Sequence, residues 1–210
     1  MEKLAKQVNA LKNDTISRVI AKRIKEFQKA GKLSGRVWFS ELCFCILTAN
    51  SKAKTAIEIE KQLGVRGFCE NRFENIRDCI KKNGHRFHNN KASFICVARE
   101  HLDIKEKVLA LTKNKSEHEI REWVANTIKG LGYKEASHFL RNVGFSGLAI
   151  VDRHIINLLA EHGLPKPKAI TKKVYLDYEN KLRRLAEDVS LSLAELDLYL
   201  WYIKTGEVLK

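Results

Sequence analysis

Proline is the residue that most constrains the fold of this chain, because only two of its 210 residues are proline, Pro165 and Pro167. Proline lacks a backbone donor and breaks helices, so the rest of the chain is free to be helical. Apolar residues recur at helical rather than alternating spacing, as Ile20, Ile24 and Phe27 do. No segment has the alternation and turn residues of paired strands. The sequence therefore predicts an all-α protein of about ten helices.

Short polar signals divide this helical chain into segments. Two Ser-x-x-Glu sequences, 116–119 and 192–195, have the form of a capping box and predict helix starts. Five glycines follow helical runs, where a residue at positive φ ends a helix most easily: Gly31, Gly64, Gly84, Gly144 and Gly163. The proline-containing segment 163–168 predicts a linker. We expect one domain over residues 1–210, in which two helical subdomains flank a cleft.

The charge favours a polyanionic partner. Lys and Arg outnumber Asp and Glu by 39 to 25, a net charge of +14, and basic side chains bind phosphate backbones by releasing counterions. Membrane surfaces and acidic proteins are also polyanionic, and the basic residues are spread along the chain, so charge alone does not decide. The N-terminal residues mix charges, and no apolar run is long enough for a signal peptide or a bilayer. The sequence predicts a cytosolic protein.

The cysteines give no sign of a metal site or a disulfide framework. There are five, an odd number, and no two have the CxxC spacing. Cys43 and Cys45 lie in the apolar run Leu-Cys-Phe-Cys-Ile-Leu-Thr-Ala. We interpret both as buried free thiols.

The most informative segment is 120–144, where a helix that ends near Ile128 and another that begins near Tyr133 are separated by Gly130-Leu-Gly132. Two glycines permit backbone torsions that other residues resist. The amides of such a turn, together with the start of the next helix, can point at one phosphate. The pattern is that of a DNA-binding helix–hairpin–helix motif, although a Gly-x-Gly turn by itself also fits an ordinary corner between helices.

Two ionisable residues follow this turn. Lys134 falls in the first turn of the second helix, where the helix dipole and partial burial both favour the neutral amine that a lysine nucleophile needs. The alternative is a surface lysine that binds phosphate. Asp152 comes after the apolar residues 148–151 and predicts a helix N-cap. A carboxylate presented from a partly buried base can also stabilise a developing sugar cation.

The hairpin followed by lysine, and then Val-Asp-Arg-His, resembles the helix–hairpin–helix superfamily of base-excision DNA glycosylases. The chain is more closely similar to the small archaeal and thermophile-type 8-oxoguanine DNA glycosylase/lyases, the second class of that activity. The similarity extends over nearly the whole chain and is carried by residues 41–50, 84–87, 128–144, 196–201 and 205–210.

This resemblance implies that the chain excises 8-oxoguanine from double-stranded DNA through a lysine Schiff base and cleaves the strand by β-elimination. It implies Lys134 as the nucleophile and Asp152 as its catalytic partner. Phe87 and Trp201 would sandwich the flipped purine, and the terminal carboxylate of Lys210 would help to read it. Four further residues would contact DNA: Gly130, Gly132, Asn50 and Arg86. We expect a monomer that needs neither a metal nor another cofactor.

The sequence departs from the superfamily in two places. The loop before Asp152, residues 145–149, contains no proline, and no cysteine follows Asp152, so no iron–sulfur cluster is expected. Three alternatives stay open from the sequence. They are a non-catalytic helix–hairpin–helix module that only holds DNA, an endonuclease III-like glycosylase for oxidised pyrimidines, and a structural protein that binds polyanions.

Overall fold

The computed structural model describes residues 1–210, and every regular element in it is helical. The all-α prediction is confirmed, with twelve α-helices and one short 3-10 helix where about ten helices were expected. The helices are α1 (Glu2–Lys12), α2 (Ile16–Lys32), α3 (Gly35–Thr48), α4 (Ala53–Glu70), α5 (Phe73–Lys82), α6 (His88–Ala98), η1 (Arg99–His101), α7 (Ile104–Leu111), α8 (Glu117–Thr127), α9 (Tyr133–Asn142), α10 (Arg153–Glu161), α11 (Lys172–Asp188) and α12 (Leu193–Thr205). None of the helices is both long and apolar enough to cross a membrane.

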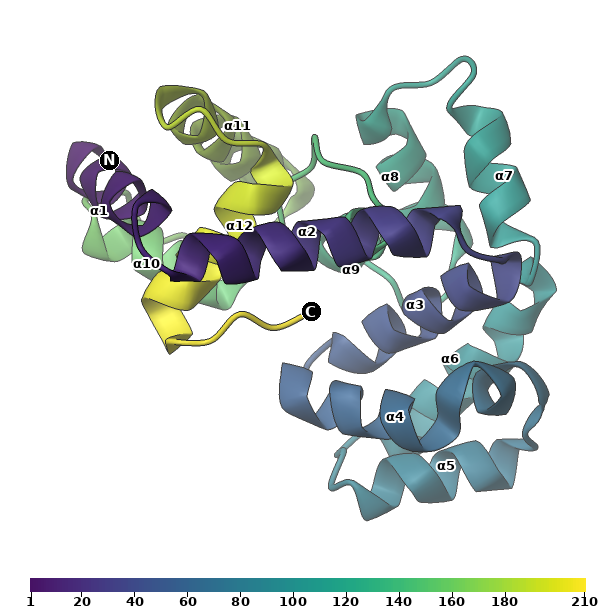
Figure 1. The fold of residues 1–210 in the computed structure, drawn as a ribbon. Coiled ribbons are helices and arrows are strands. Elements are labelled where there is room, and N and C mark those ends of the chain that lie inside the picture. The colour runs from purple at the N-terminus through teal and green to yellow at the C-terminus, as the bar shows by residue number, and fades with distance from the viewer.

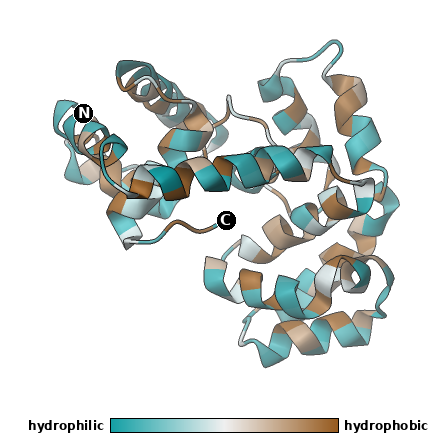
Figure 2. Cartoon of the chain, in the orientation of Figure 1, coloured by the Kyte–Doolittle hydropathy of each residue, from teal (hydrophilic) through white to brown (hydrophobic).

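The buried apolar side chains form two separate cores. One contains 28 residues and is built from α3 to α9. The other contains 21 residues and combines α1 and α2 with α10 to α12, so both ends of the chain contribute to it. Figure 1 shows these two groups of helices on opposite sides of the molecule, with α2 extending across from one to the other. Much of the side of α2 that faces the viewer in Figure 2 is hydrophilic, while its buried Ile20 and Phe27 belong to the second core.

Local sequence signals set many helix boundaries. Ser116 and Ser192 both make the predicted capping boxes, in which the serine side chain accepts from the backbone of the third residue and the glutamate there accepts from the serine amide. Helix α3 is buried along most of its length and contains Cys43 and Cys45, which are free thiols at 0% exposure as predicted.

One glycine prediction is wrong. Gly64, Gly84, Gly144 and Gly163 have positive φ, but Gly31 lies inside α2 with helical backbone. A Cβ at Gly31 would stand 2.3 Å from the carbonyl oxygen of Val143, at the end of α9. The missing side chain therefore permits the close approach of α2 and α9 and does not form a turn.

Candidate active site

A cleft of about 970 Å³ lies between the two groups of helices and is bordered by the start of α9, the start of α10, the residues after α3 and the end of α12. The structure brings six of the predicted site residues to its lining: Asn50, Gly132, Lys134, Asp152, Trp201 and Lys210. Basic side chains are frequent in this lining, among them Lys52, Arg153 and Lys172. A cleft with this charge suits a phosphate backbone.

The hairpin between α8 and α9 has the boundaries that the sequence predicts. Gly130 has a φ of +93° and lies against the ring of Phe94 on α6, where a Cβ would come within 2.5 Å. Both the torsion and the close approach require glycine at this position. The amide of the half-buried Gly130 donates to no protein acceptor, and the amide of Gly132 donates to Glu135 Oε2 at 3.2 Å. The hairpin is thus packed against α6 and keeps an amide free for an anion.

Lys134 lies in the first turn of α9 and lines the cleft. Its side chain is 24% exposed, and its Nζ lies 3.2 Å from Glu135 Oε1. The same glutamate accepts from the hairpin amide of Gly132. Glu135 therefore holds both the turn and the amine, a link that the sequence analysis did not foresee.

Asp152 is the N-cap of α10, as predicted. Its Oδ1 accepts from the amides of His154 and Ile155 at 2.8 and 2.9 Å. Its other carboxylate oxygen has no hydrogen bond within the protein, and the residue lines the cleft that also contains Lys134. One oxygen therefore fixes the carboxylate, and the other is available to a positive charge in the cleft.

The family model described as 8-oxoguanine DNA glycosylase matches residues 20–191. The chain belongs to the 8-oxoguanine DNA glycosylase family.

Relatives and solved structures of this family match along most of the chain. The 8-oxoguanine DNA glycosylase/AP lyase of Methanocaldococcus jannaschii is 46% identical over 209 residues, 99% of each chain. The Aquifex aeolicus protein of the same name is 51% identical over 178 residues, 82% of this chain and 78% of its own. The crystal structure of the M. jannaschii glycosylase/lyase with a 15mer DNA containing 8-oxoguanine has a TM-score of 0.93 at 45% identity, covering 99% of this chain and 100% of that one. The Thermotoga maritima 8-oxoguanine DNA glycosylase has a TM-score of 0.91 at 37% identity, with both chains fully covered.

The last residues of this 8-oxoguanine DNA glycosylase family member run back from α12 toward α3 and α4 (Figure 1). The Nζ of Lys210 lies 2.8 Å from Glu41 Oε1 and 2.5 Å from Glu60 Oε1, and 4.5 Å from the centre of the Phe44 ring. Its side chain is therefore engaged with the first core, while the residue still lines the cleft. Trp201 packs edge-on against His154, with 5.2 Å between ring centres.

Three predicted residues lie elsewhere in the glycosylase family fold. Phe87, Arg86 and Gly130 do not line the cleft. The Arg86 guanidinium stacks over the Phe87 ring at 4.5 Å, just before α6 begins. The structure thus does not place Phe87 with Trp201 in one cavity, and their pairing stays a prediction. Asn50 does line the cleft, at a φ of 59°, a strained conformation of the kind that gathers at functional sites.

An ion pair in the wall of the cleft is not predicted by the sequence. Arg141 on α9 pairs with Asp197 on α12, and both residues line the cleft. Burial raises the pKa of Asp197 to about 6, which Arg141 opposes and the nearby Asp152 reinforces. The available signal was a carboxylate inside the apolar run 196–201. No group of three or more His, Cys, Asp or Glu side chains is arranged to hold a metal ion.

Proposed function

We propose that this chain excises 8-oxoguanine from double-stranded DNA and then cleaves the strand at the resulting abasic site, with Lys134 as the nucleophile for both steps. The observation that carries the proposal is that Lys134 and Asp152 line one cleft in a chain 46% identical over 209 residues to a glycosylase/AP lyase. A module that only holds DNA would account for the hairpin and the charge. It would leave the amine and the carboxylate in the cleft without a purpose.

Access to the lesion comes first. The glycosidic bond of a stacked purine is out of reach, so the nucleotide must rotate out of the duplex into a pocket at a cost of a few kcal/mol. The hairpin amides and the basic cleft would hold the backbone, and an aromatic face returns about 1–3 kcal/mol per stacked base. Trp201 is available in the cleft for one face. Phe87 would supply the other face by approaching when DNA binds, because it lies outside the cleft lining.

The chemistry then needs one amine. Neutral Lys134 Nζ bonds to C1′ of the sugar while the glycosidic bond breaks and the purine leaves with its electron pair. The free oxygen of Asp152 stabilises the positive charge on the sugar. The attacking nitrogen then loses a proton, and Glu135 Oε1, 3.2 Å away, is an acceptor in place. The C1′–O4′ bond then breaks and O4′ takes a proton, which opens the sugar ring and leaves an imine between C1′ and the lysine nitrogen. The imine acidifies the C2′ proton, whose loss expels the 3′ phosphate and breaks the strand.

The test is a lysine substitution combined with borohydride, which reduces the imine and fixes the enzyme to DNA. Lys134→Gln should lose the trapped adduct and strand cleavage while keeping affinity for a lesion duplex. Asp152→Asn should bind DNA and lose most excision. A Lys134→Gln protein that still forms the adduct would refute the assignment.

The substrate is tested separately, with a panel of labelled duplexes that each carry one lesion, under single-turnover conditions. We expect 8-oxoguanine opposite a normal base to be excised faster than any oxidised pyrimidine. Faster excision of the pyrimidines would favour the endonuclease III-like alternative. An abasic duplex that stays intact would favour the non-catalytic module.

A further inference from the structure

The segment from Phe145 to Asp152 lies between α9 and α10 and has no helical structure. It contains no proline, whose ring would fix a backbone torsion, so its own residues do not make it rigid. Its residues Leu148 to Val151 are nevertheless buried, at 1–7% exposure. Buried backbone groups outside a helix need partners, and here the partners come from side chains of two helices, α8 and α11.

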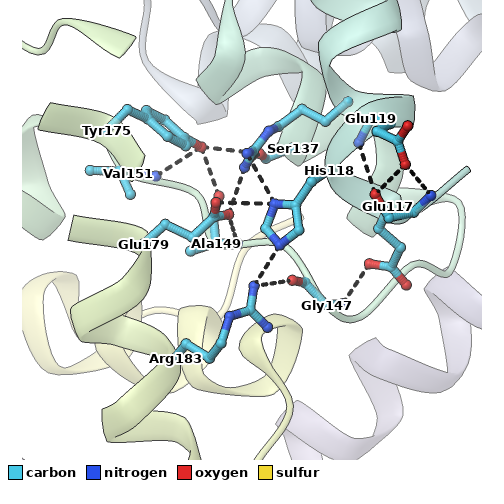
Figure 3. A network of polar contacts seen from close by, with 12 residues as sticks. Glu117, His118, Glu119, Ser137, Gly147, Ala149, Val151, Tyr175, Glu179 and Arg183 are labelled. Carbon is cyan, nitrogen blue, oxygen red and sulfur yellow. Dashed lines mark hydrogen bonds and ion pairs between the residues drawn. The ribbon is translucent and has the colours of Figure 1, made fainter. Parts of the chain in front are cut away.

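Tyr175 and Glu179, both on α11, make the central contacts (Figure 3). The Ala149 amide donates to Glu179 Oε1 at 3.0 Å. The Tyr175 hydroxyl donates to the Ala149 carbonyl at 2.7 Å and accepts from the Val151 amide at 3.3 Å. Both backbone groups of Ala149 are therefore held, and so is the amide of the residue directly before Asp152.

The far end of the segment is held in the same way. The Gly147 amide donates to Glu117 Oε2 on α8 at 2.8 Å, and Arg183 on α11 donates to the Gly147 carbonyl at 3.0 Å. From Gly147 to Val151, the backbone of every second residue is therefore held by hydrogen bonds to side chains (Figure 3). The path of the chain into Asp152 is fixed at Gly147, Ala149 and Val151.

The same hydroxyl also reaches the helix that carries Lys134. Tyr175 Oη lies 3.0 Å from Ser137 Oγ, and Ser137 is one turn after Lys134 on α9. Residues three apart lie on one side of a helix. The Tyr175 hydroxyl therefore joins the segment that presents Asp152 to the helix that presents Lys134.

Holding this geometry requires a buried charge. Glu179 is 1% exposed and is neutralised by Arg121, also 1% exposed, at 2.6 Å. The Arg121 guanidinium in turn lies over the ring of Tyr175 at 5.3 Å. A buried ion pair adds little stability compared with apolar residues. What this pair provides is a fixed acceptor for the Ala149 amide.

We propose that Tyr175 and Glu179 are positioning residues that set the placement of Asp152 relative to Lys134. Tyr175 borders the cleft but is 2% exposed, and its hydroxyl is occupied by protein groups, so it acts through Asp152 and not on the substrate. The inference rests on the proposed function, because it assigns these residues to the reaction of Lys134 and Asp152.

The test compares two substitutions on one helix. Tyr175→Phe removes the hydroxyl from the segment before Asp152. Tyr178→Phe removes the hydroxyl that donates to the Pro165 carbonyl, in the linker on the other side of α10, and is the matched control. We expect Tyr175→Phe to slow single-turnover excision about tenfold to a hundredfold, with lesion affinity and the Tyr178→Phe rate within about twofold of the wild type.

A double substitution separates positioning from general loosening. If Tyr175 acts through Asp152, then Tyr175→Phe should have almost no further effect on excision in the Asp152→Asn protein, because residues that work as a unit are not additive. The same loss of rate in both backgrounds overturns the proposal. So does a Tyr175→Phe rate equal to that of Tyr178→Phe in the wild-type background.

A substitution at a second residue keeps the proposal testable if the Tyr175→Phe protein does not fold. Glu117→Ala removes the acceptor of the Gly147 amide from a half-buried position and should slow excision with the same dependence on Asp152. A wild-type chain that leaves 8-oxoguanine duplexes intact would refute the proposed function itself. If the wild-type chain excises 8-oxoguanine, and Glu117→Ala and Tyr175→Phe both do so at the wild-type rate, only the positioning role is refuted.

Discussion

Lys91, on α6, should destabilise the folded protein, and replacing it by methionine should be stabilising. The residue is 5% exposed and makes no hydrogen bond or ion pair through its amine. Burial lowers the pKa of its ammonium group from 10.5 to about 8; Glu135 opposes the shift and Lys134 adds to it. The folded state therefore binds this proton less tightly than the unfolded chain does.

The sign and size follow from linkage. Because the folded pKa is the lower one, the penalty is fully present below pH 8 and disappears as the pH rises toward the unfolded value. A shift from 10.5 to about 8 costs about 3 kcal/mol near pH 7 and under about 1 kcal/mol near pH 10. Methionine has a similar length and no charge. Lys91→Met should therefore raise the free energy of unfolding by about 3 kcal/mol near neutral pH.

Guanidinium denaturation of both proteins near pH 7 and near pH 10 measures this difference. Lys22→Met, at an exposed lysine without an ion pair, is the control and should change little at either pH. An equal increase in the free energy of unfolding at both pH values would show that methionine stabilises through apolar packing and that the buried charge of Lys91 carries no penalty. No gain near pH 7 would refute the reasoning entirely. In the predicted case, the chain retains a buried cation near Lys134 at a cost in stability.

Two further substitutions test contacts described above. Glu41→Gln combined with Glu60→Gln removes both charges that hold the Lys210 ammonium. We expect lesion discrimination to fall more than DNA affinity, measured as the ratio of excision to binding of undamaged duplex. An unchanged ratio would contradict this. Gly31→Ala places a Cβ 2.3 Å from the Val143 carbonyl oxygen, so thermal unfolding should show a loss of about 1–3 kcal/mol, and an unchanged melting temperature would be the contrary result.

The features that the sequence predicts well are those with a local cause. Capping boxes, the hairpin boundaries and the N-cap at Asp152 each depend on residues within one helical turn, so a short window contains all the information. The position of Lys134 in the first turn of its helix is predictable for the same reason. These predictions needed no knowledge of which helices meet.

The features that escaped prediction depend on distant pairs. Arg121 and Glu179 meet although 58 positions separate them, and nothing in either segment selects the partner. The local sequence at Gly31 wrongly predicts a helix end, because the neighbour that requires glycine there, Val143, is far along the chain. Asp197 and Arg141 belong to the same class. Long-range contacts of this kind follow from the packing of the whole chain.

Helix α2 has a consequence for how a duplex could be accommodated. It contributes Ile20 and Phe27 to the second core and touches α9 at Gly31 so closely that no side chain fits between. Because α2 contacts both groups of helices, a hinge motion of one group relative to the other would have to break these contacts. Most of the bending must then occur in the DNA. We expect lesions in base-pair steps that resist deformation to be excised more slowly than the same lesions in easily deformed steps.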